Sequence, residues 1–310
     1  MSTKTIETKV TAALFTKVIP FTKYFLFVSL ISIFLILLGV VFYFVKGGFI
    51  LGIDFKGGVK IECVIKAKNI DIKEVRNLFA SSKMTAEVNY VGKPEENSYL
   101  ITLPVEGSDA QSVISNAISL LNAKAESENI EIKGSEMVEP KIGEAFAFKA
   151  IQLLVIVSIL IMLYIVFRFD IFYSVGAILA LLHDALMMLA FTLFLNIPID
   201  ITIIAAILTI LGYSINDTIV LFDRIRELKQ LTPQEDFGLI IDKSVTQTLN
   251  RTIITSLTTI FVAVALWLFG GIVLRNFAMI LTVGLISGTY SSIFIASYTT
   301  MLLRKAFLKE

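Results

Sequence analysis

Six stretches of this chain are apolar enough to cross a membrane as helices, each of which needs about 20 mostly apolar residues. They cover residues 24–45, 150–167, 172–195, 201–222, 252–268 and 277–303. Charged side chains make up 17% of the 310 residues, against about 25% in soluble proteins. The pattern predicts an integral membrane protein and excludes a soluble enzyme, a disordered chain and a disulfide scaffold. The first stretch is longer than the roughly 7–15 apolar residues of a signal peptide, so we expect an uncleaved anchor.

The charged residues are concentrated between the first two apolar stretches. Residues 46–149 hold 28 of the 53 Asp, Glu, Lys and Arg side chains. We therefore expect a water-soluble domain at 46–149, inserted between a first helix at 24–45 and five further helices at 150–303. The expected organisation is completed by a tail at 1–23, a loop at 223–251 and a tail at 304–310.

The distribution of Lys and Arg predicts the orientation. Six spans place both termini on one side of the membrane, and positive charges gather on the cytoplasmic side. The opposite short loops contain only Arg275. We expect the termini and the 223–251 loop in the cytoplasm and the 46–149 domain outside, because the first side contains Lys4, Lys9, Lys17, Lys23, Arg168, Arg224, Arg226, Lys229, Lys243, Arg251, Arg304, Lys305 and Lys309.

The inserted domain shows the element order β-α-β-β-α-β, that of the ferredoxin-like split βαβ unit. Apolar alternation and helical periodicity predict strands at 59–66, 86–92, 98–105 and 129–138, and helices that begin at Asp71 and at Ser108 or Asp109. The domain contains no nucleotide-binding loop and no nucleophile–base pair, so we expect it to bind or move something. The only cysteine, Cys63, lies on the apolar face of the first strand, and we interpret it as a core residue.

Residue counts exclude further classes. One cysteine and one histidine exclude an intramolecular disulfide and a Cys- or His-cluster metal site. A net charge of +1 gives no basic excess for nucleic-acid binding. We expect no metal site and no catalytic residues.

Asp217 is the strongest candidate for a functional residue inside the membrane, because ionisable groups there are costly and usually functional. We expect it to lie in the cytoplasmic half of the fourth span. Asn216 and Thr218 flank it as hydrogen-bond donors, and Arg251 begins the fifth span at a comparable depth. An Asp217–Arg251 pair would keep the carboxylate charged, and separating the two would favour its protonation. The alternative is a fixed interhelical ion pair.

His183 and Asp184 lie near the middle of the third span. Adjacent helical residues point about 100° apart, so we do not expect both to face one partner. A proton relay and polar helix packing stay open for them. In the last span, small residues recur every four positions, which favours close helix packing; they are Gly284, Gly288, Ser292 and Ala296.

Several motifs resemble those of one known family. Residues 51–58 (LGIDFKGG), with Asp54, Phe55, Gly57 and Gly58, resemble the glycine-pair signature of the SecF family. Residues 213–227, 251–259 and 288–296 resemble its fourth, fifth and sixth spans, and His183-Asp184 falls where the family has the same dipeptide. Two positions depart from the pattern: Lys56 replaces a small hydroxyl residue, and Glu139 stands where glycine is usual.

The resemblance implies an RND-like half with a ferredoxin-like external domain, acting as an accessory subunit of the Sec protein translocase in the bacterial inner membrane. It implies SecD and the SecYEG channel as partners, with YajC, YidC, the translocating unfolded polypeptide and membrane lipids as further contacts. The proton motive force would drive late translocation without a bound cofactor, with sodium as the alternative coupling ion. Asp217 and Arg251 match the proposed proton-pathway residues of the family; Asn216 and Thr218 are added for their proximity alone.

Two other classes of protein share parts of this pattern. Asp184 and Asp217 on neighbouring spans could form an intramembrane aspartyl protease, but the Gly-x-Gly-Asp and Tyr-Asp motifs are missing. A metalloprotease needs His-Glu-x-x-His, which one histidine cannot supply. A small-solute or lipid transporter usually needs two six-span halves, and this chain supplies one.

Overall fold

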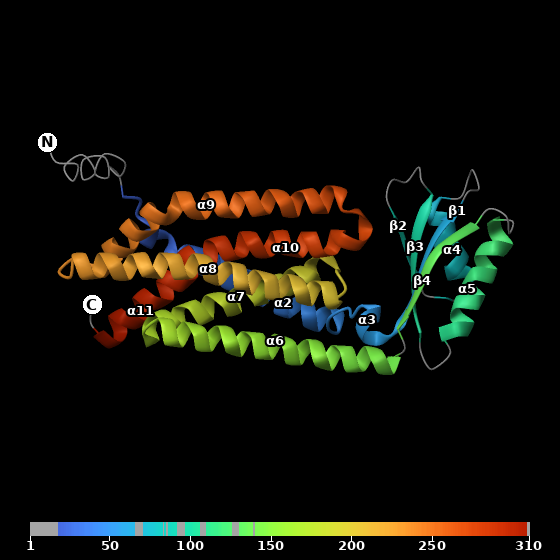
Figure 1. Ribbon diagram of the computed structural model, residues 1–310, viewed down its shortest axis with the longest axis horizontal. Coiled ribbons are helices and arrows are strands. Elements are labelled where there is room, and N and C mark those ends of the chain that lie inside the picture. The colour runs from blue at the N-terminus through green and yellow to red at the C-terminus, as the bar shows by residue number, and fades with distance from the viewer. Residues whose placement is uncertain are drawn as a thin grey trace.

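The computed structural model describes residues 18–65, 71–82, 84, 86–91, 97–105, 110–125, 130–138 and 140–308. A bundle of long helices continues at one end into a small α/β domain (Figure 1). The predicted fold class is confirmed: the chain forms six long apolar helices, and a small antiparallel α/β domain is inserted in the sequence between the first and the second of them. Glu139, Ser108, Asp109 and the lysines of the first 17 residues lie outside the described residues.

Several of the six spanning helices are longer than the apolar stretches that predict them. Three begin at an aspartate whose side chain accepts a backbone N–H of the first turn: Asp170 before α7, Asp200 before α8 and Asp236 before α9. A 3₁₀ turn, η1 (Phe21–Tyr24), precedes the first span. The spans are α2 (Phe25–Lys46), α6 (Pro140–Arg168), α7 (Ile171–Leu195), α8 (Ile201–Leu231), α9 (Phe237–Phe269) and a last helix made of α10 (Gly271–Ser291), the π-helical turn η4 (Ser292–Ala296) and α11 (Ser297–Leu308).

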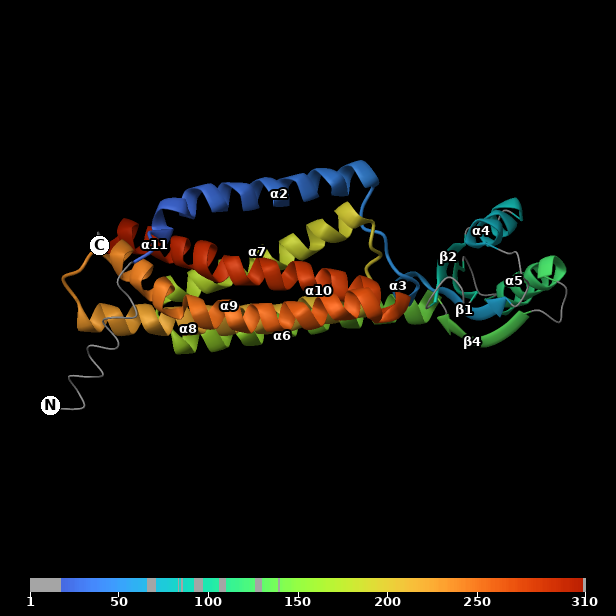
Figure 2. The same ribbon diagram turned by 90° about the horizontal axis from the view of Figure 1, so that it is seen from above.

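The helices α7, α8 and α10 form the centre of the bundle. Half of the most apolar segment of α7 is buried inside the structure, and the same holds for α8. The buried share is slightly larger in the last span, whereas almost none of the apolar segment of α6 is buried. Figure 2 shows α2 running along one side of this group. The central helices therefore hold the bundle's polar interior, and the exposed apolar faces of α2 and α6 are suited to lipid.

Two sequence-based boundaries need correction. The second span begins at Pro140, inside the predicted external domain, because its first turns pack on the connection from α2: a Cβ on Gly143 would lie 2.8 Å from the Phe55 carbonyl oxygen. The predicted 223–251 loop is mostly helical, since α8 continues to Leu231 and α9 begins at Phe237. The chain leaves the apolar stretches here without leaving the helices, because low hydropathy ends a membrane span without ending a helix.

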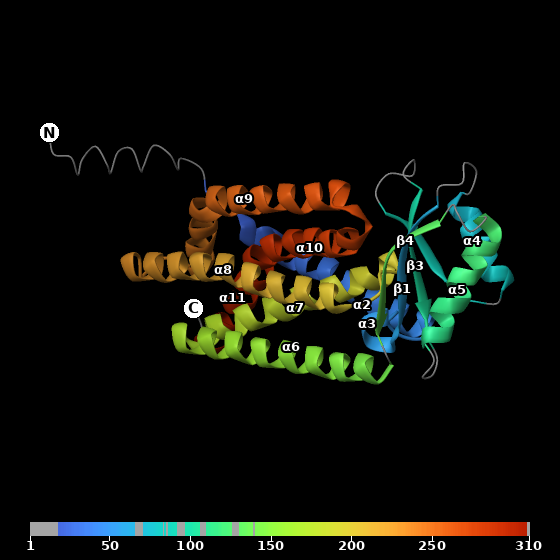
Figure 3. The ribbon, with the colours of Figure 1, turned by 45° about the vertical axis from the view of Figure 1, so that its right-hand side comes forward.

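The α/β domain has the ferredoxin-like topology. Its strands pair antiparallel in the order β2-β3-β1-β4, with α4 and α5 on one face of the sheet (Figure 3). Cys63 is fully buried in its core, and burial raises the pKa of the thiol to about 11. The elements are β1 (Gly58–Ile65), α4 (Ile72–Ser81), β2 (Glu87–Tyr90), β3 (Ser98–Pro104), α5 (Ala110–Ala125) and β4 (Ile130–Val138).

Residues 50–58 join this domain to the bundle. Leu51 forms a parallel β-bridge with Ile199, just before α8. The short helix α3 (Ile53–Lys56) follows, and Asp54 accepts the backbone N–H of Ile201, the first residue of α8, at 3.2 Å. Lys60 on β1 pairs with the same carboxylate at 3.4 Å. This segment, which we call the joint, therefore connects β1 to the start of α8. Lys56, which departs from the family motif, is exposed in the joint.

We predict that Gly58→Ala loosens the joint and the adjoining sheet. A Cβ at Gly58 would lie 2.7 Å from the Leu103 carbonyl oxygen, so the sheet must shift, at a cost of about 1–3 kcal/mol. Local unfolding exposes Cys63, so the rate at which a maleimide labels this thiol measures the effect. Gly134→Ala is the matched control, since nothing lies within 4 Å of its Cβ position. Equal labelling rates in the two variants would contradict the prediction.

Candidate functional site

Two carboxylates are buried inside the bundle. Asp184 on α7 has no solvent exposure, and Asp217 on α8 is 3% exposed. A buried charge requires compensation by hydrogen bonds or a counter-charge. The two aspartates differ sharply in how far they receive it.

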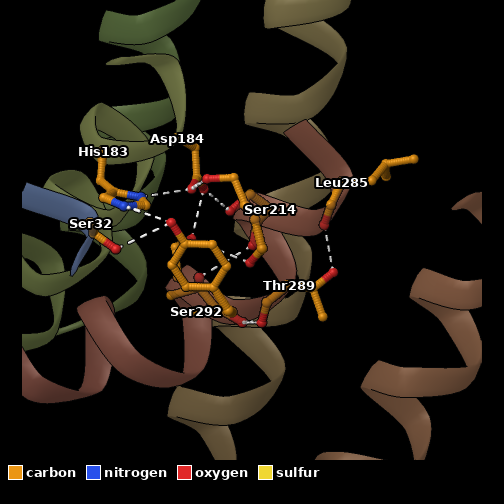
Figure 4. Close-up of polar contacts among 12 residues, drawn as sticks. Ser32, His183, Asp184, Ser214, Leu285, Thr289 and Ser292 are labelled. Atoms are coloured by element: carbon orange, nitrogen blue, oxygen red, sulfur yellow. Dashed lines mark hydrogen bonds and ion pairs between the residues drawn. The ribbon is translucent and has the colours of Figure 1, made fainter. Parts of the chain in front are cut away.

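Asp184 is saturated with hydrogen bonds. Its Oδ2 accepts from the hydroxyls of Ser214 at 2.6 Å and Ser291 at 2.8 Å. Its Oδ1 accepts from the hydroxyl of Ser287 at 2.8 Å and lies 3.0 Å from Nδ1 of His183. A carboxylate has about four acceptor positions, so all are taken by groups from α7, α8 and α10. Figure 4 shows His183, Asp184 and Ser214 meeting in this cluster.

His183 extends the cluster towards α2. Its Nε2 lies 3.2 Å from the Tyr290 hydroxyl, which is 3.2 Å from the hydroxyl of Ser32 (Figure 4). His183 and Asp184 both reach α10 but contact different residues of it, in keeping with the expectation that they do not face one partner. Their backbone directions diverge, but α10 presents Tyr290 to one and Ser287 and Ser291 to the other.

The polar contacts continue to α9. The Thr289 hydroxyl donates to that of Ser256 at 2.8 Å. The hydroxyls of Thr259 and Tyr213 lie 3.4 Å apart, joining α9 to α8. Side chains from α2, α7, α8, α9 and α10 thus belong to one polar core. Sequence reasoning missed Ser32, Ser214, Ser287, Tyr290 and Ser291; the i, i+4 spacing of Ser287 and Ser291 around Gly288 was the available signal.

Asp217 lacks such partners. Its Oδ2 is buried without a hydrogen-bond partner among the residues that the structure describes. The expected donors do not reach it: Thr218 donates to the Ser214 carbonyl at 3.2 Å, and Asn216 is exposed. Arg251 is also exposed, and the expected ion pair with Asp217 is not formed between these two described residues.

The small residues of α10 allow the close helix contacts around Asp184. A Cβ on Gly284 would lie 2.6 Å from Cγ1 of Ile210, and one on Gly288 would lie 3.0 Å from Cβ of Ser214. Ser292, in the π-helical turn, donates to the Thr289 carbonyl within its own helix.

The motif residues Asp54, Phe55, Gly57 and Gly58 belong to the joint and do not contact either carboxylate. Within the described ranges, no group of three His, Cys, Asp or Glu side chains could hold a metal.

The fold and this polar core define a class: a multi-pass membrane protein with ionisable groups in a six-span bundle and an inserted ferredoxin-like domain. Residues 118–306 match the family "Protein export membrane protein SecD/SecF, C-terminal". The chain is 36% identical over 287 residues to the protein translocase subunit SecF of Borreliella burgdorferi, covering 91% of this chain and 96% of that one. It is 40% identical over 289 residues to SecF of Sebaldella termitidis, covering 91% and 89%.

A solved structure shows the same arrangement. The crystal structure of SecDF from Thermus thermophilus, described as a translocon-associated membrane protein, superposes with a TM-score of 0.77 at 33% identity, covering 94% of this chain. The chain spans 39% of that SecDF chain. The chain therefore belongs to the SecF family of protein translocase subunits, which are transporter components and not enzymes.

We predict that Asp184→Asn destabilises the bundle far more than Asp217→Asn. The amide at 184 would keep one acceptor oxygen and turn an NH₂ donor towards hydroxyls that themselves donate, which costs about 2 kcal/mol or more. Asp217→Asn removes no hydrogen bond from Oδ2 and should cost less than about 1 kcal/mol. Thermal unfolding of the purified variants in one detergent measures both. A lower midpoint for Asp217→Asn than for Asp184→Asn would contradict the prediction.

Proposed function

We propose that this translocase subunit pairs with SecD beside the SecYEG channel and uses the proton motive force to promote late translocation of secreted proteins. The observation that carries the proposal is the buried Oδ2 of Asp217, which has no partner within the described chain. An uncompensated charge inside a bundle is costly, and taking up a proton removes that cost. Asp217 is therefore the carboxylate suited to alternate between two protonation states.

The neighbours of Asp217 favour a proton over a sodium ion. A hard cation needs several oxygen ligands around it. The Thr218 hydroxyl is engaged with a carbonyl, and Asn216 points to the surface. Arg251 would attract the charged form of Asp217 and release the protonated form. A proton that crosses 100 mV supplies about 2.3 kcal/mol to bias this change.

The joint offers a route from this proton step to the external domain. Asp217 lies on α8, and α8 begins at the backbone N–H that Asp54 holds. Asp54 is also paired with Lys60 on β1 of the domain. A shift of α8 after protonation would pull on β1 through this contact. The domain would then move relative to the membrane and hold the emerging unfolded polypeptide against backsliding.

SecD association is supported by an exposed face of α8. Small or polar residues follow one another there at helical spacing, and a Cβ on Gly212 would meet nothing within 4 Å. Small residues let membrane helices approach closely. We propose that SecD packs on this face, made of Ala205, Thr209, Gly212 and Asn216. YajC, YidC and lipids are proposed as peripheral contacts.

We also propose that both termini lie in the cytoplasm of a bacterium. The ends of α8 and α11 lie at the end of the bundle opposite the α/β domain (Figure 1). The cations Arg168, Arg226 and Arg304 belong to that end, where Arg168 pairs with Asp223. The positive-inside rule makes this end cytoplasmic and places the α/β domain in the periplasm.

The proposal predicts that Asp217→Asn abolishes the stimulation of export by a proton gradient. The assay follows the late translocation of a secretory protein into inverted membrane vesicles with and without the gradient. Translocation should fall to the gradient-free level while the complex stays assembled. Asp223→Asn, which breaks an exposed ion pair on the same helix, is the control and should keep the stimulation. Full stimulation in the Asp217 variant would show that Asp217 is not part of coupling.

The SecD interface has its own test. Gly212→Leu should reduce the SecD recovered with the purified subunit several-fold, because the added side chain blocks close approach of a helix. Val155→Phe enlarges a side chain on the exposed face of α6 and should leave recovery unchanged. Equal recovery from both variants would place the SecD interface elsewhere.

A further inference from the structure

The hydrogen bonds around Asp184 suit a carboxylate. Four groups fill its acceptor positions, three of them serine hydroxyls that donate to it. A protonated carboxyl would keep every contact only if its O–H pointed at Nδ1 of His183, which would make the ring the Nε2–H tautomer. With Asp184 as an anion, a further proton that enters this cluster binds elsewhere.

The anion in turn fixes the tautomer of His183. An ionised carboxylate only accepts, so Nδ1 of His183 carries the proton in that 3.0 Å contact. In the neutral ring Nε2 is then an acceptor, and it receives the Tyr290 hydroxyl at 3.2 Å. Tyr290 accepts in turn from Ser32 at 3.2 Å. Ser32, Tyr290 and His183 thus each donate once towards Asp184, and Ser287, which also donates to Asp184, lies beside the Tyr290 hydroxyl.

This directed chain leaves one position for a further proton. We propose that His183 is a second proton-binding site of the bundle, separate from Asp217, and that Nε2 receives its proton along the hydroxyls of Ser32 and Tyr290. When Nε2 gains a proton it becomes a donor to Tyr290, and Tyr290 then donates to Ser32. Both hydroxyls reverse without any heavy atom moving, and the charge of the His183–Asp184 pair changes from −1 to zero.

Among the residues that the structure describes, Asp184 is the charged group that contacts the His183 ring. Asp184 on α7 and Tyr290 on α10 are the titratable groups that it contacts. The facing helix α2 contributes the Ser32 hydroxyl, and its one charged residue, Lys46, is at the C-terminal end of that helix. On α8, Ser214 faces Asp184, and Asp217 follows one turn later. A neutral pair is favoured over a lone anion in such a site.

A second observation extends the path along α2. Ser29 lies one turn before Ser32 and is 8% exposed, yet its hydroxyl has no hydrogen-bond partner among the described residues. Hydroxyls buried in membrane bundles ordinarily find a partner. Ser29 and Ser32 thus form a polar row that runs from the His183 cluster towards the N-terminal end of α2. Tyr290 also lies just before the π-helical turn, a feature frequent at functional sites.

Because His183 is the only histidine, one experiment reads the site directly. The full-length protein is labelled with ¹⁵N-imidazole histidine, purified with a histidine-free tag and reconstituted in lipid vesicles. Solid-state NMR then follows the two ring nitrogens from about pH 9 to about pH 5, the range in which histidines titrate. We expect the Nδ1–H tautomer at high pH and a reversible shift of Nε2 to its protonated position at low pH. A ring that stays unchanged, or that starts as the Nε2–H tautomer, would overturn the proposal.

Two tyrosine variants test the path. Tyr290→Phe removes the donor to Nε2, so the Nε2 signal of the neutral ring should shift and its pH response should change. Tyr298→Phe alters a tyrosine two turns further along the same helix and should give the wild-type spectrum. Identical spectra for Tyr290→Phe and wild type would overturn the assigned path.

The protonation of His183 does not depend on the proposed role of Asp217. We expect Asp217→Asn to keep the NMR titration of His183 while it loses the stimulation of export. The contribution of His183 to export does rest on the proposed function, and His183→Gln in the vesicle assay measures it separately. Loss of the titration in Asp217→Asn would show that the two residues form one site.

Discussion

The carboxylate of Asp184 is the constraint on which the arrangement of the bundle depends. It has no solvent exposure and accepts from side chains of α7, α8 and α10. An anion in this position is tolerated only while all these helices stay in register, because each lost donor leaves charge without compensation. The small residues of α10 follow from the same requirement: Gly288 faces Ser214, and a larger side chain would separate the hydroxyl from Asp184.

Asp217, less than one turn of α8 beyond Ser214, has the opposite environment. It is almost as buried, yet its Oδ2 has no partner among the described residues. We propose that the two carboxylates serve different purposes: the saturated one holds the helices together, and the unsaturated one changes charge. Titratable groups whose environments differ in this way are how proteins divide structural and proton-transfer roles. Since α8 also starts at the joint, the proposed route from Asp217 to the α/β domain runs along this one helix.

The sequence predicted those parts of the structure that depend on local pattern. Apolar length predicted six spans, and the alternation in 59–65 together with the Asp71 cap predicted the ferredoxin-like order. It did not predict where the helices end in the 223–251 connection, at Leu231 and Phe237, because low hydropathy marks the end of a membrane span and not of a helix. Nor did it predict the partners of Asp184 or the missing partner of Asp217. Both depend on which faces of distant helices meet, and one sequence carries no direct record of that.

We propose that Asp217 takes up a proton while Asp184 stays ionised. Infrared difference spectroscopy of the reconstituted protein measures this directly, since a protonated carboxyl has a C=O stretch that an ionised one lacks. Lowering the pH should produce such a band in the wild type and in Asp184→Asn, and the band should be missing from Asp217→Asn. A band that persists in Asp217→Asn and disappears in Asp184→Asn would contradict the account.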